Sequence, residues 1–364
     1  GHYPVALIGG ATGRVGDPSG KSSERPLLDE VALARNSEAI GGTLCKILTT
    51  SSTVSTVKIV NNVDWYSNMG ILDFLRDVGK YSRIGTMLAK DSVKSRLASE
   101  SGISFTEFSY QLLQGYDFVH LFRSYEVCVQ VGGSDQWGNI TAGTDLMRRL
   151  EPDADVSGLT FPLLLKSDGT KFGKSEQGAI WLSPERLSPY KFYQYFLNVD
   201  DADVIRLMKM LTFLPLSEIA MHEDSMKTSG YVVNTAQKRL AEEVTRFVHG
   251  ERELQRAQLA TAALRPGADT HLDVNTLSAL RDIVPSASLS VTDVLGVSLV
   301  ELVVKVGLQP SKGATRRLIK GGGLRLNNTK VSSEEATIQE GDIVDGKLLL
   351  LSAGKKNKLL ISIA

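Results

Sequence analysis

The stretch Val5–Arg25, VALIGGATGRVGDPSGKSSER, decides how the rest of the chain is interpreted. Its apolar run 5–8 is typical of a strand in a parallel sheet. Glycines follow at positions 9, 10, 13 and 16, and they let the backbone approach a ligand closely. Together with the carboxylate of Asp17 and the cations Lys21 and Arg25, they indicate a nucleotide-handling loop at the end of a strand.

Neither of two standard phosphate-binding patterns fits this loop. A Walker loop needs about four residues between its glycine and its Gly-Lys pair, whereas Gly16 and Gly20 enclose only Asp17, Pro18 and Ser19. The dinucleotide pattern GxGxxG has a different glycine spacing, and no clean βαβ unit with an acidic residue at its second strand end is expected here. A glycine-rich turn with solvated cations is the alternative for this stretch taken alone.

Composition excludes several classes of protein. The chain has 364 residues, which predicts two or three domains. Its formal net charge is zero, so any binding of nucleic acid must come from local clustering of cations. Cys45 and Cys128 lack CxxC spacing and the histidines are scattered, which argues against a zinc site or a disulfide framework. No apolar run approaches the roughly eighteen residues of a membrane span.

Polar side chains also follow two further expected strands. They are Asn61, Asn62 and Trp65 after a strand at 57–60, and Gly133, Asp135 and Gln136 after a strand at 127–131. Ligands bind at the carboxyl ends of strands in open α/β sheets, and a carboxylate there can hold a ribose hydroxyl. The recurrence of such loops favours a binding site built from several strand ends.

The segment 104–122 is expected to form a helix. On it Tyr110, Gln114 and Asp117 fall at i, i+4 and i+7, so one face presents a phenol, an amide and a carboxylate. Such a face can line a polar pocket for a small ligand. A polar stripe that faces water is the alternative for this helix considered by itself.

A strand expected at 161–165 precedes the loop 168–175, DGTKFGKS. Its lysines, Lys171 and Lys174, suit a mobile clamp on phosphate charge that tightens in the transition state. A solvated basic turn is the alternative.

From residue 190 the pattern becomes helical. Aromatic residues at 190–196 are expected to form core. A helix at 235–249 is expected to have Asn234 as its N-cap and Gly250 as its stop.

A basic region follows, because no acidic residue occurs between Glu301 and Glu334. A helix expected at 312–320 can grip a phosphate backbone, and a solvated charged face is the alternative. The cations of this region include Lys312, Arg316, Arg317, Lys320 and Arg325.

Four motifs, in this order, closely resemble those of bacterial and organellar tyrosyl-tRNA synthetases: VALIGGATGRVGDPSGK, SYQLLQGYDF, VGGSDQWGNITAG and DGTKFGKS. The similarity covers essentially the whole chain and is strongest to plant organellar members. It implies an α/β fold, with a class I Rossmann-type catalytic domain at 1–189 and a helical anticodon-recognition domain at 190–285. A linker at 286–296 and a small α+β RNA-binding domain of the alpha-L type at 297–364 would follow.

The resemblance also implies roles for single residues. Tyrosine would be bound through its amino group by Asp17, Tyr110 and Gln114, through its phenol hydroxyl by Asp117, and through its carboxylate by Gln136. ATP and pyrophosphate would be contacted by Thr12, Lys21, Arg25, Gly133, Asp135, Lys171, Lys174 and Ser175. The RNA-binding residues would be Lys312, Arg316, Arg317, Lys320 and Arg325. No metal site made by the protein is implied, and Mg²⁺ would accompany ATP.

The implied function is a tyrosine–tRNA ligase, which activates tyrosine with ATP and transfers it to tRNA(Tyr). A homodimer without membrane association is implied, located in a chloroplast or mitochondrion for a plant source, or in bacterial cytoplasm. The alternatives are a non-catalytic RNA-binding relative and a tryptophan-specific cousin. The HIGH-type motif of class I synthetases is not found in the sequence, and we expect it, with any transit peptide, to lie before Gly1.

Overall fold

The computed structural model describes residues 2–20, 24–26, 28–50, 57–100, 102–170, 172–175, 178–265, 272–281, 283–354 and 357–364. The chain divides into two units, Gly1–Ala179 and Ile180–Ala364. This division lies ten residues before the domain boundary expected after residue 189, which falls at the start of α8 (Pro189–Leu197).

The first unit contains two parallel strand pairs. In one, β1 (Val5–Ile8) pairs with β2 (Lys58–Asn61), and in the other, β3 (Val129–Gly133) pairs with β4 (Ser157–Phe161). Within the described residues no strand pairs with both, so the expected parallel sheet is present as two pairs. α1 (Glu30–Thr50) connects β1 to β2. A βαβ unit therefore follows the opening loop, but its second strand ends in an asparagine and not in the acidic residue of the dinucleotide pattern, as expected.

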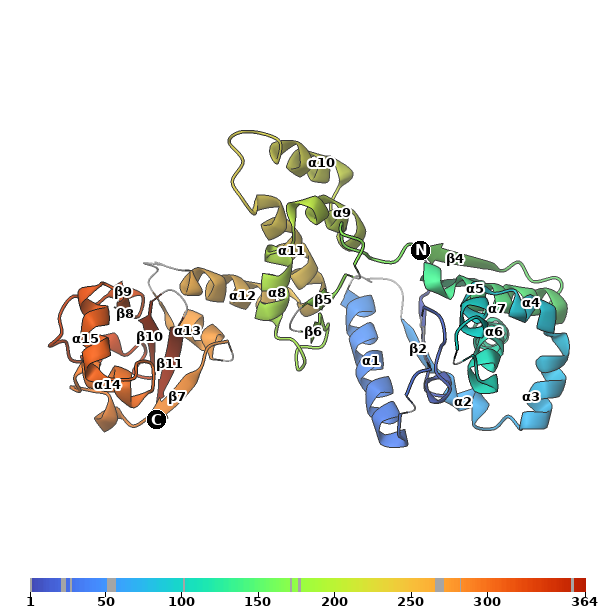
Figure 1. Cartoon of the computed structure of the whole chain (residues 1–364), viewed down its shortest axis with the longest axis horizontal. Coiled ribbons are helices and arrows are strands. Elements are labelled where there is room, and N and C mark those ends of the chain that lie inside the picture. The colour runs from blue at the N-terminus through green and yellow to red at the C-terminus, as the bar shows by residue number, and fades with distance from the viewer. Residues whose placement is uncertain are drawn as a thin grey trace. The chain divides into compact units, whose positions relative to one another are not determined.

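The helical core of this unit is formed by α6 (Phe105–Tyr125) and α7 (Trp137–Leu150), which lie side by side (Figure 1). Phe118 from α6 and Met147 from α7 are fully buried in one apolar cluster. Gly143 allows this close approach, because a Cβ there would lie 3.2 Å from the Phe118 ring. The other helices of the unit are α2 (Val63–Tyr66), α3 (Ile71–Asp77), α4 (Ile84–Leu88) and α5 (Asp91–Leu97).

β4 does not lie where the sequence predicted it. The apolar letters of 161–165 indicated a strand there, whereas β4 ends at Phe161. Pro162 follows directly, and proline has no N–H to donate to a ladder. The pairing with β3 thus uses the less apolar residues that come before this proline.

Helices dominate the first part of the second unit. Phe192, Tyr193 and Phe196 of α8 are buried, which confirms the expected aromatic core. Asn234 does not cap the helix that follows it, because its backbone is left-handed (φ 66°) and its side chain makes no cap hydrogen bond. The Tyr231 hydroxyl instead accepts from the N–H of Ala236 at 3.1 Å. The helices after α8 are α9 (Asp201–Leu211), α10 (Leu216–Ser225), α11 (Thr235–His249), α12 (Glu251–Leu264) and α13 (Val274–Leu280).

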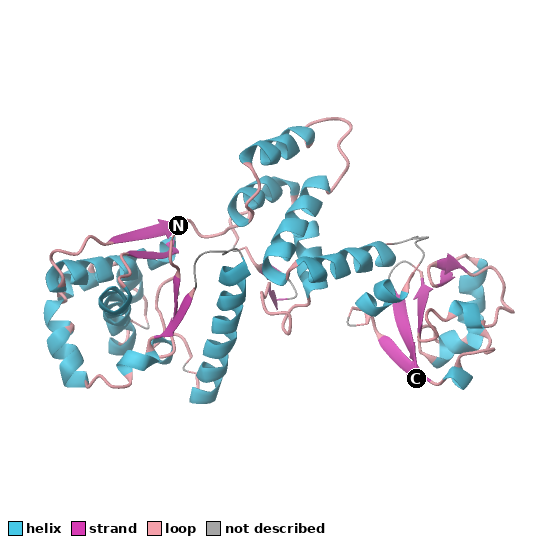
Figure 2. Ribbon diagram, turned by 180° about the vertical axis from the view of Figure 1, so that it is seen from behind, coloured by secondary structure: helices cyan, strands magenta, loops and turns pink. Residues whose placement is uncertain are grey.

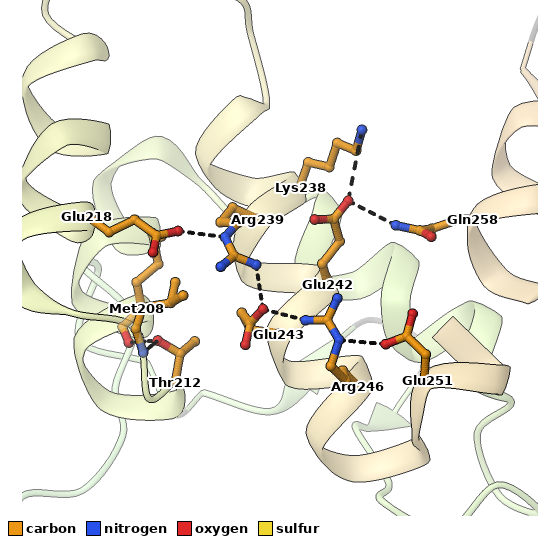
Figure 3. Close-up of polar contacts among 11 residues, drawn as sticks. Met208, Thr212, Glu218, Lys238, Arg239, Glu242, Glu243, Arg246, Glu251 and Gln258 are labelled. Carbon is orange, nitrogen blue, oxygen red and sulfur yellow. Dashed lines mark hydrogen bonds and ion pairs between the residues drawn. The ribbon is translucent and has the colours of Figure 1, made fainter. Parts of the chain in front are cut away.

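An ionic network ties α10, α11 and α12 together (Figure 3). Arg239 of α11 contacts Glu218 of α10 at 2.7 Å and also pairs with Glu243. Arg246 shares Glu243 and contacts Glu251 of α12 at 2.7 Å. Because each arginine lies between two carboxylates, the network fixes the mutual orientation of three helices more than any isolated surface pair would.

A mixed sheet forms the C-terminal part, with strand order β7-β11-β10-β8-β9. Figure 2 shows its strands in magenta beside cyan helices. β7 (Ser286–Leu289) runs parallel to β11 (Asn357–Ile363), so the first four residues of the expected linker are part of this sheet. The other elements are β8 (Leu324–Leu326), β9 (Thr329–Lys330), β10 (Leu348–Ala353), α14 (Leu299–Lys305) and α15 (Lys312–Lys320).

The sheet contributes to two apolar cores. On one side Leu349 and Leu351 of β10 pack with Leu302 of α14 and Ile319 of α15. On the other side Leu348, Leu350 and Leu360 pack with α12 and α13. β10 is buried along its whole length because both faces are covered. None of the helices within the described part of the chain has the length and apolarity needed to cross a bilayer.

Candidate active site

Two asparagines at the end of β2 hold the loop that follows β1. The N–H of Gly10 donates to Asn61 Oδ1 at 3.1 Å, and the N–H of Ala11 donates to Asn62 Oδ1 at 2.7 Å. A Cβ at Gly10 would lie 2.4 Å from Asn61 Oδ1, so this close approach requires glycine. The expected meeting of strand ends is thus present for β1 and β2.

Asn62 continues this contact toward α6. Its side chain is fully buried, and its Nδ2 donates to Thr12 Oγ1 at 3.0 Å and to Asp117 Oδ2 at 3.1 Å. Trp65 Nε1 donates to the other carboxylate oxygen, Asp117 Oδ1, at 3.0 Å. Thr12, which was assigned to ATP from the sequence, therefore lies on the Asp117 side of the site.

Asp117 is the most perturbed carboxylate of this site. Its side chain is 2% exposed, and burial raises the pKa of the carboxyl from 3.8 to about 6, against the lowering effect of hydrogen bonds from Asn62 and Trp65. A carboxylate can accept about four hydrogen bonds. With donors from Asn62 and Trp65 and a further interaction with the Tyr66 hydroxyl, it retains acceptor capacity for one more hydroxyl.

A second polar cluster surrounds Asp17. Its Oδ1 accepts from the Ser19 N–H at 2.9 Å, and its Oδ2 accepts from Gln136 Nε2 at 2.8 Å. Asn139, at the start of α7, is buried, and its Nδ2 lies 3.3 Å from Asp17 Oδ1 and 3.2 Å from Ser19 Oγ. The loop after β1 and the loop after β3 are thereby joined through one carboxylate.

Tyr110 is influenced by residues of both clusters. Burial raises the pKa of its phenol, and the charges of Asp17 and Asp117 raise it further. The negative charges of both carboxylates thus favour the protonated phenol. Two of the three side chains expected on one face of α6, Tyr110 and Asp117, are therefore in the same site. Gln114 is half-buried on the same helix.

Only some of the residues expected to bind ATP lie in the described part of the chain. Arg25 is exposed, and its Nε donates to the backbone oxygen of Asp17 at 2.9 Å. Asp135 is also exposed, in the short turn after β3. Lys21 and Lys171 lie outside the described residues. Lys174 and Ser175 form β5 (Lys174–Ser175), of which the backbone is described.

A buried ion pair supports the start of α6. Arg96 Nη1 contacts Glu107 Oε1 at 2.6 Å, with side chains only 3% and 1% exposed. Ser104 caps the helix by accepting from the Glu107 N–H at 3.2 Å, and its Oγ donates to Glu24 at 2.9 Å. The helix that carries Tyr110 and Asp117 is therefore fixed at its first turn.

Sequence reasoning missed Asn139 and Ser19, and it left the role of Asn62 open. Asn139 lies three residues after Gln136 and could have been noticed on that spacing. The ring of His120 stacks on the ring of Trp65, with 4.2 Å between the two centroids. In the described part of the chain no cluster of three or more His, Cys, Asp or Glu could hold a metal ion.

The basic helix α15 belongs to the second unit. Lys312, Arg316, Arg317 and Lys320 are exposed on it, whereas Thr315 and Ile319 face the core. Arg325, on β8, donates from Nη1 to the Asn328 carbonyl at 2.7 Å and so is partly engaged within its own hairpin.

Comparison with known proteins identifies the family of the chain. Residues 1–264 match the family described as tRNA synthetases class I (W and Y), and residues 277–361 match the tyrosine–tRNA ligase SYY-like C-terminal domain. The chloroplastic/mitochondrial tyrosine–tRNA ligase of Arabidopsis thaliana is 59% identical over 366 residues, which cover 100% of this chain and 72% of that one. The tyrosine–tRNA ligase of Protochlamydia amoebophila is 53% identical, covering 99% and 85%.

A solved structure is similar as well. The C-terminally truncated mitochondrial tyrosyl-tRNA synthetase of Aspergillus nidulans superimposes with a TM-score of 0.58 at 32% identity, over 71% of this chain and 75% of that one. The expected α/β fold and the resemblance are thus confirmed. The chain belongs to the tyrosine–tRNA ligase family of class I aminoacyl-tRNA synthetases.

Proposed function

We propose that the chain binds tyrosine between Asp17 and Asp117, activates it with ATP and transfers it to tRNA(Tyr). The observation that carries this proposal is the buried carboxylate of Asp117, held by Asn62 and Trp65. A second carboxylate, Asp17, acts on the same phenol as Asp117, because both charges raise the pKa of Tyr110. Two carboxylates near one tyrosine fit a ligand with a phenol hydroxyl at one end and an ammonium group at the other.

Asp117 would accept the hydrogen bond of the phenol hydroxyl. A phenylalanine in the same pocket would leave this buried acceptor without its partner, and a buried group that loses its partner is costly. Tyrosyl-tRNA synthetase is itself the reference case for this kind of rejection, so its factor of about 10⁵ is a benchmark and not a value worked out from this structure.

Asp17 would bind the substrate ammonium group, together with Tyr110 and Gln114. Gln136 donates to Asp17 and would reach the substrate carboxylate from the same side. Thr12 contacts Asn62, so we assign it to the tyrosine pocket and no longer to ATP. In this arrangement the loop after β1 touches the amino acid with Asp17 and turns toward ATP with the residues that follow.

Activation needs no protein nucleophile. The tyrosine carboxylate attacks the α-phosphorus of ATP. The bond from the α-phosphorus to the oxygen that bridges it to the β-phosphorus breaks, and pyrophosphate leaves with the electron pair. The protein aligns the reactants and stabilises the charge that develops on the leaving group. We assign this stabilisation to Lys21, Arg25, Lys171 and Lys174, with Ser175 in the same loop. Gly133 and Asp135 would contact the adenosine, and Mg²⁺ would enter with ATP.

Tyrosine-dependent exchange of labelled pyrophosphate into ATP tests this proposal. Exchange with tyrosine, and not with tryptophan or phenylalanine, is the expected result. Absence of exchange in a protein that still binds tRNA(Tyr) would favour a non-catalytic RNA-binding relative instead.

The exposed cations of α15 would bind the phosphate backbone of the tRNA, with Arg325 beside them. Supporting this, the four cations of α15 all lie outside the core that Thr315 and Ile319 join. Deleting 297–364 is a poor test, because Leu348, Leu350 and Leu360 complete a core with α12 and α13. Replacing Arg316 and Lys320 with alanine is better. Charging of tRNA should weaken while adenylate formation persists.

Two finer assignments follow from the family. A homodimer is proposed, and light scattering on the purified chain would show twice the mass of 39.5 kDa.

A chloroplast or mitochondrial location is proposed because the Arabidopsis relative is 59% identical and the bacterial one 53%. Cell fractionation followed by detection of the chain with an antibody would test this location. A signal confined to the cytoplasmic fraction would contradict it.

A further inference from the structure

The two acidic residues at the ends of the basic region both contact its helix, α15. Glu301 and Glu334 are separated by a stretch without any Asp or Glu. Lys312 Nζ at the start of α15 contacts Glu301 Oε1 at 2.6 Å. Lys320 Nζ at its end contacts Glu334 Oε1 at 3.1 Å. The long acid-free stretch in sequence is therefore not acid-free in space.

Glu334 spans two cations. Its Oε2 lies 3.7 Å from Arg316 Nε, in addition to the contact with Lys320. Arg316 and Lys320 are one helical turn apart on the same face of α15, and their side chains are 57% and 73% exposed. A carboxylate held across two exposed cations occupies the position that a phosphate group of RNA would take on this face.

We propose that Glu334 is an internal competitor for RNA phosphate, which lowers the affinity of α15 for every RNA by about the same factor, so that tight binding requires additional contacts elsewhere on the protein. This inference rests on the proposed binding of RNA by α15. The partner that displaces Glu334 is a phosphodiester backbone, and Arg316 and Lys320 exchange one anion for another when it binds.

The energetics of exposed ion pairs support this role. Pairs of this kind contribute little to the stability of a fold, because solvent screens them and two long side chains are immobilised. The contacts of Glu334 are therefore weak enough for a polyanion to displace. They still act on binding, since a neighbouring negative charge repels each phosphate that approaches within a Debye length of about 10 Å.

The expected size of the effect follows from one unit of charge. Removing a carboxylate about 5 Å from a bound phosphate, in water, should raise RNA affinity about fourfold at low salt. Cations already paired with Glu334 release fewer counterions when RNA binds. Freeing one of them should make the dependence of log affinity on log salt steeper by about 0.7–0.9.

Glu334→Gln and Glu335→Gln form a matched pair of variants in the full chain. Both remove one negative charge, and Glu335 is exposed with no ion pair recorded among the described residues. Affinity for a fluorescent tRNA(Tyr) transcript and for polyuridylate is measured by anisotropy over a series of salt concentrations. Thermal unfolding checks that each variant is folded. The same measurements are made with Arg316→Ala/Lys320→Ala, with and without Glu334→Gln.

Glu334→Gln should tighten both RNAs by about the same factor, about fourfold at low salt, and the gain should vanish near about 1 M salt. It should have no effect once Arg316 and Lys320 are alanine. Two results would overturn the proposal and leave the RNA-binding function standing. One is equal tightening by Glu335→Gln. The other is that Glu334→Gln does not tighten binding although Arg316→Ala/Lys320→Ala weakens it. Wild-type affinity of Arg316→Ala/Lys320→Ala would overturn the binding face itself.

Discussion

Replacing Asp117 with asparagine should remove a pH dependence from the stability of the first unit. The Asp117 carboxyl has a pKa of about 6 in the folded protein, raised from 3.8 by burial. Between these two values the folded state holds a proton that the unfolded state has lost. Stability therefore falls as pH rises through this window, and it levels off above the folded pKa.

The magnitude follows from the shift. At about 1.36 kcal/mol per pKa unit, the displacement from 3.8 to about 6 costs about 3 kcal/mol when the carboxylate is fully ionised. About 2 kcal/mol of this should appear between about pH 4 and about pH 8, because the unfolded carboxyl is already partly ionised at the lower pH. The wild-type chain should lose this amount relative to Asp117→Asn over that range.

Trp65 supplies the probe, because its indole N–H donates to Asp117. Trp137 and Trp181 are 55% and 43% exposed, so phenylalanine at both positions leaves Trp65 as the single tryptophan at small structural cost. Urea unfolding is followed by its fluorescence at several pH values, with and without Asp117→Asn. Parallel pH profiles in the two proteins would refute the raised pKa and with it the buried, ionisable state of Asp117.

Three further predictions concern the support of the site and its chemistry. Glu107→Ala should cost about 3–5 kcal/mol because it leaves Arg96 buried without a partner, whereas Arg96→Met/Glu107→Leu should be near neutral by urea unfolding; equal losses would contradict a buried pair. Asn139→Ala should raise KM for tyrosine about tenfold and leave KM for ATP unchanged in pyrophosphate exchange, because one hydrogen bond that orients Asp17 is lost; a change confined to ATP would be inconsistent with the assigned contact. Lys171→Ala and Lys174→Ala should lower kcat more than they raise KM for tyrosine, and equal changes would argue against a clamp that acts in the transition state.

The sequence predicted best what is local. The strand followed by glycines at 5–16 and the helical face with Tyr110 and Asp117 were both legible, because period and turn chemistry are encoded in neighbouring residues. The bounds of the helix predicted at 235–249 also match those of α11. The four motifs in order then gave the family.

What the sequence could not supply is long-range pairing. Asn62 lies 55 residues from Asp117 and Asn139 lies 122 residues from Asp17, so no local pattern announces either contact. The same holds for Glu334, whose carboxylate neutralises part of a helix that looked purely basic. The strand predicted at 161–165 was wrong for a local reason. The prediction relied on the apolar run and gave too little weight to Pro162, which cannot donate to a strand ladder.

The most direct test of the account compares kcat/KM for tyrosine and for phenylalanine in pyrophosphate exchange, in the wild-type chain and in Asp117→Ala. A hydrogen bond to a charged group contributes about 1.5–3 kcal/mol, so kcat/KM for tyrosine should fall about 10-fold to 150-fold. The value for phenylalanine should change little, and the preference for tyrosine should narrow accordingly. An unchanged preference, whether both values persist or both fall together, would contradict the central claim that Asp117 recognises the phenol hydroxyl.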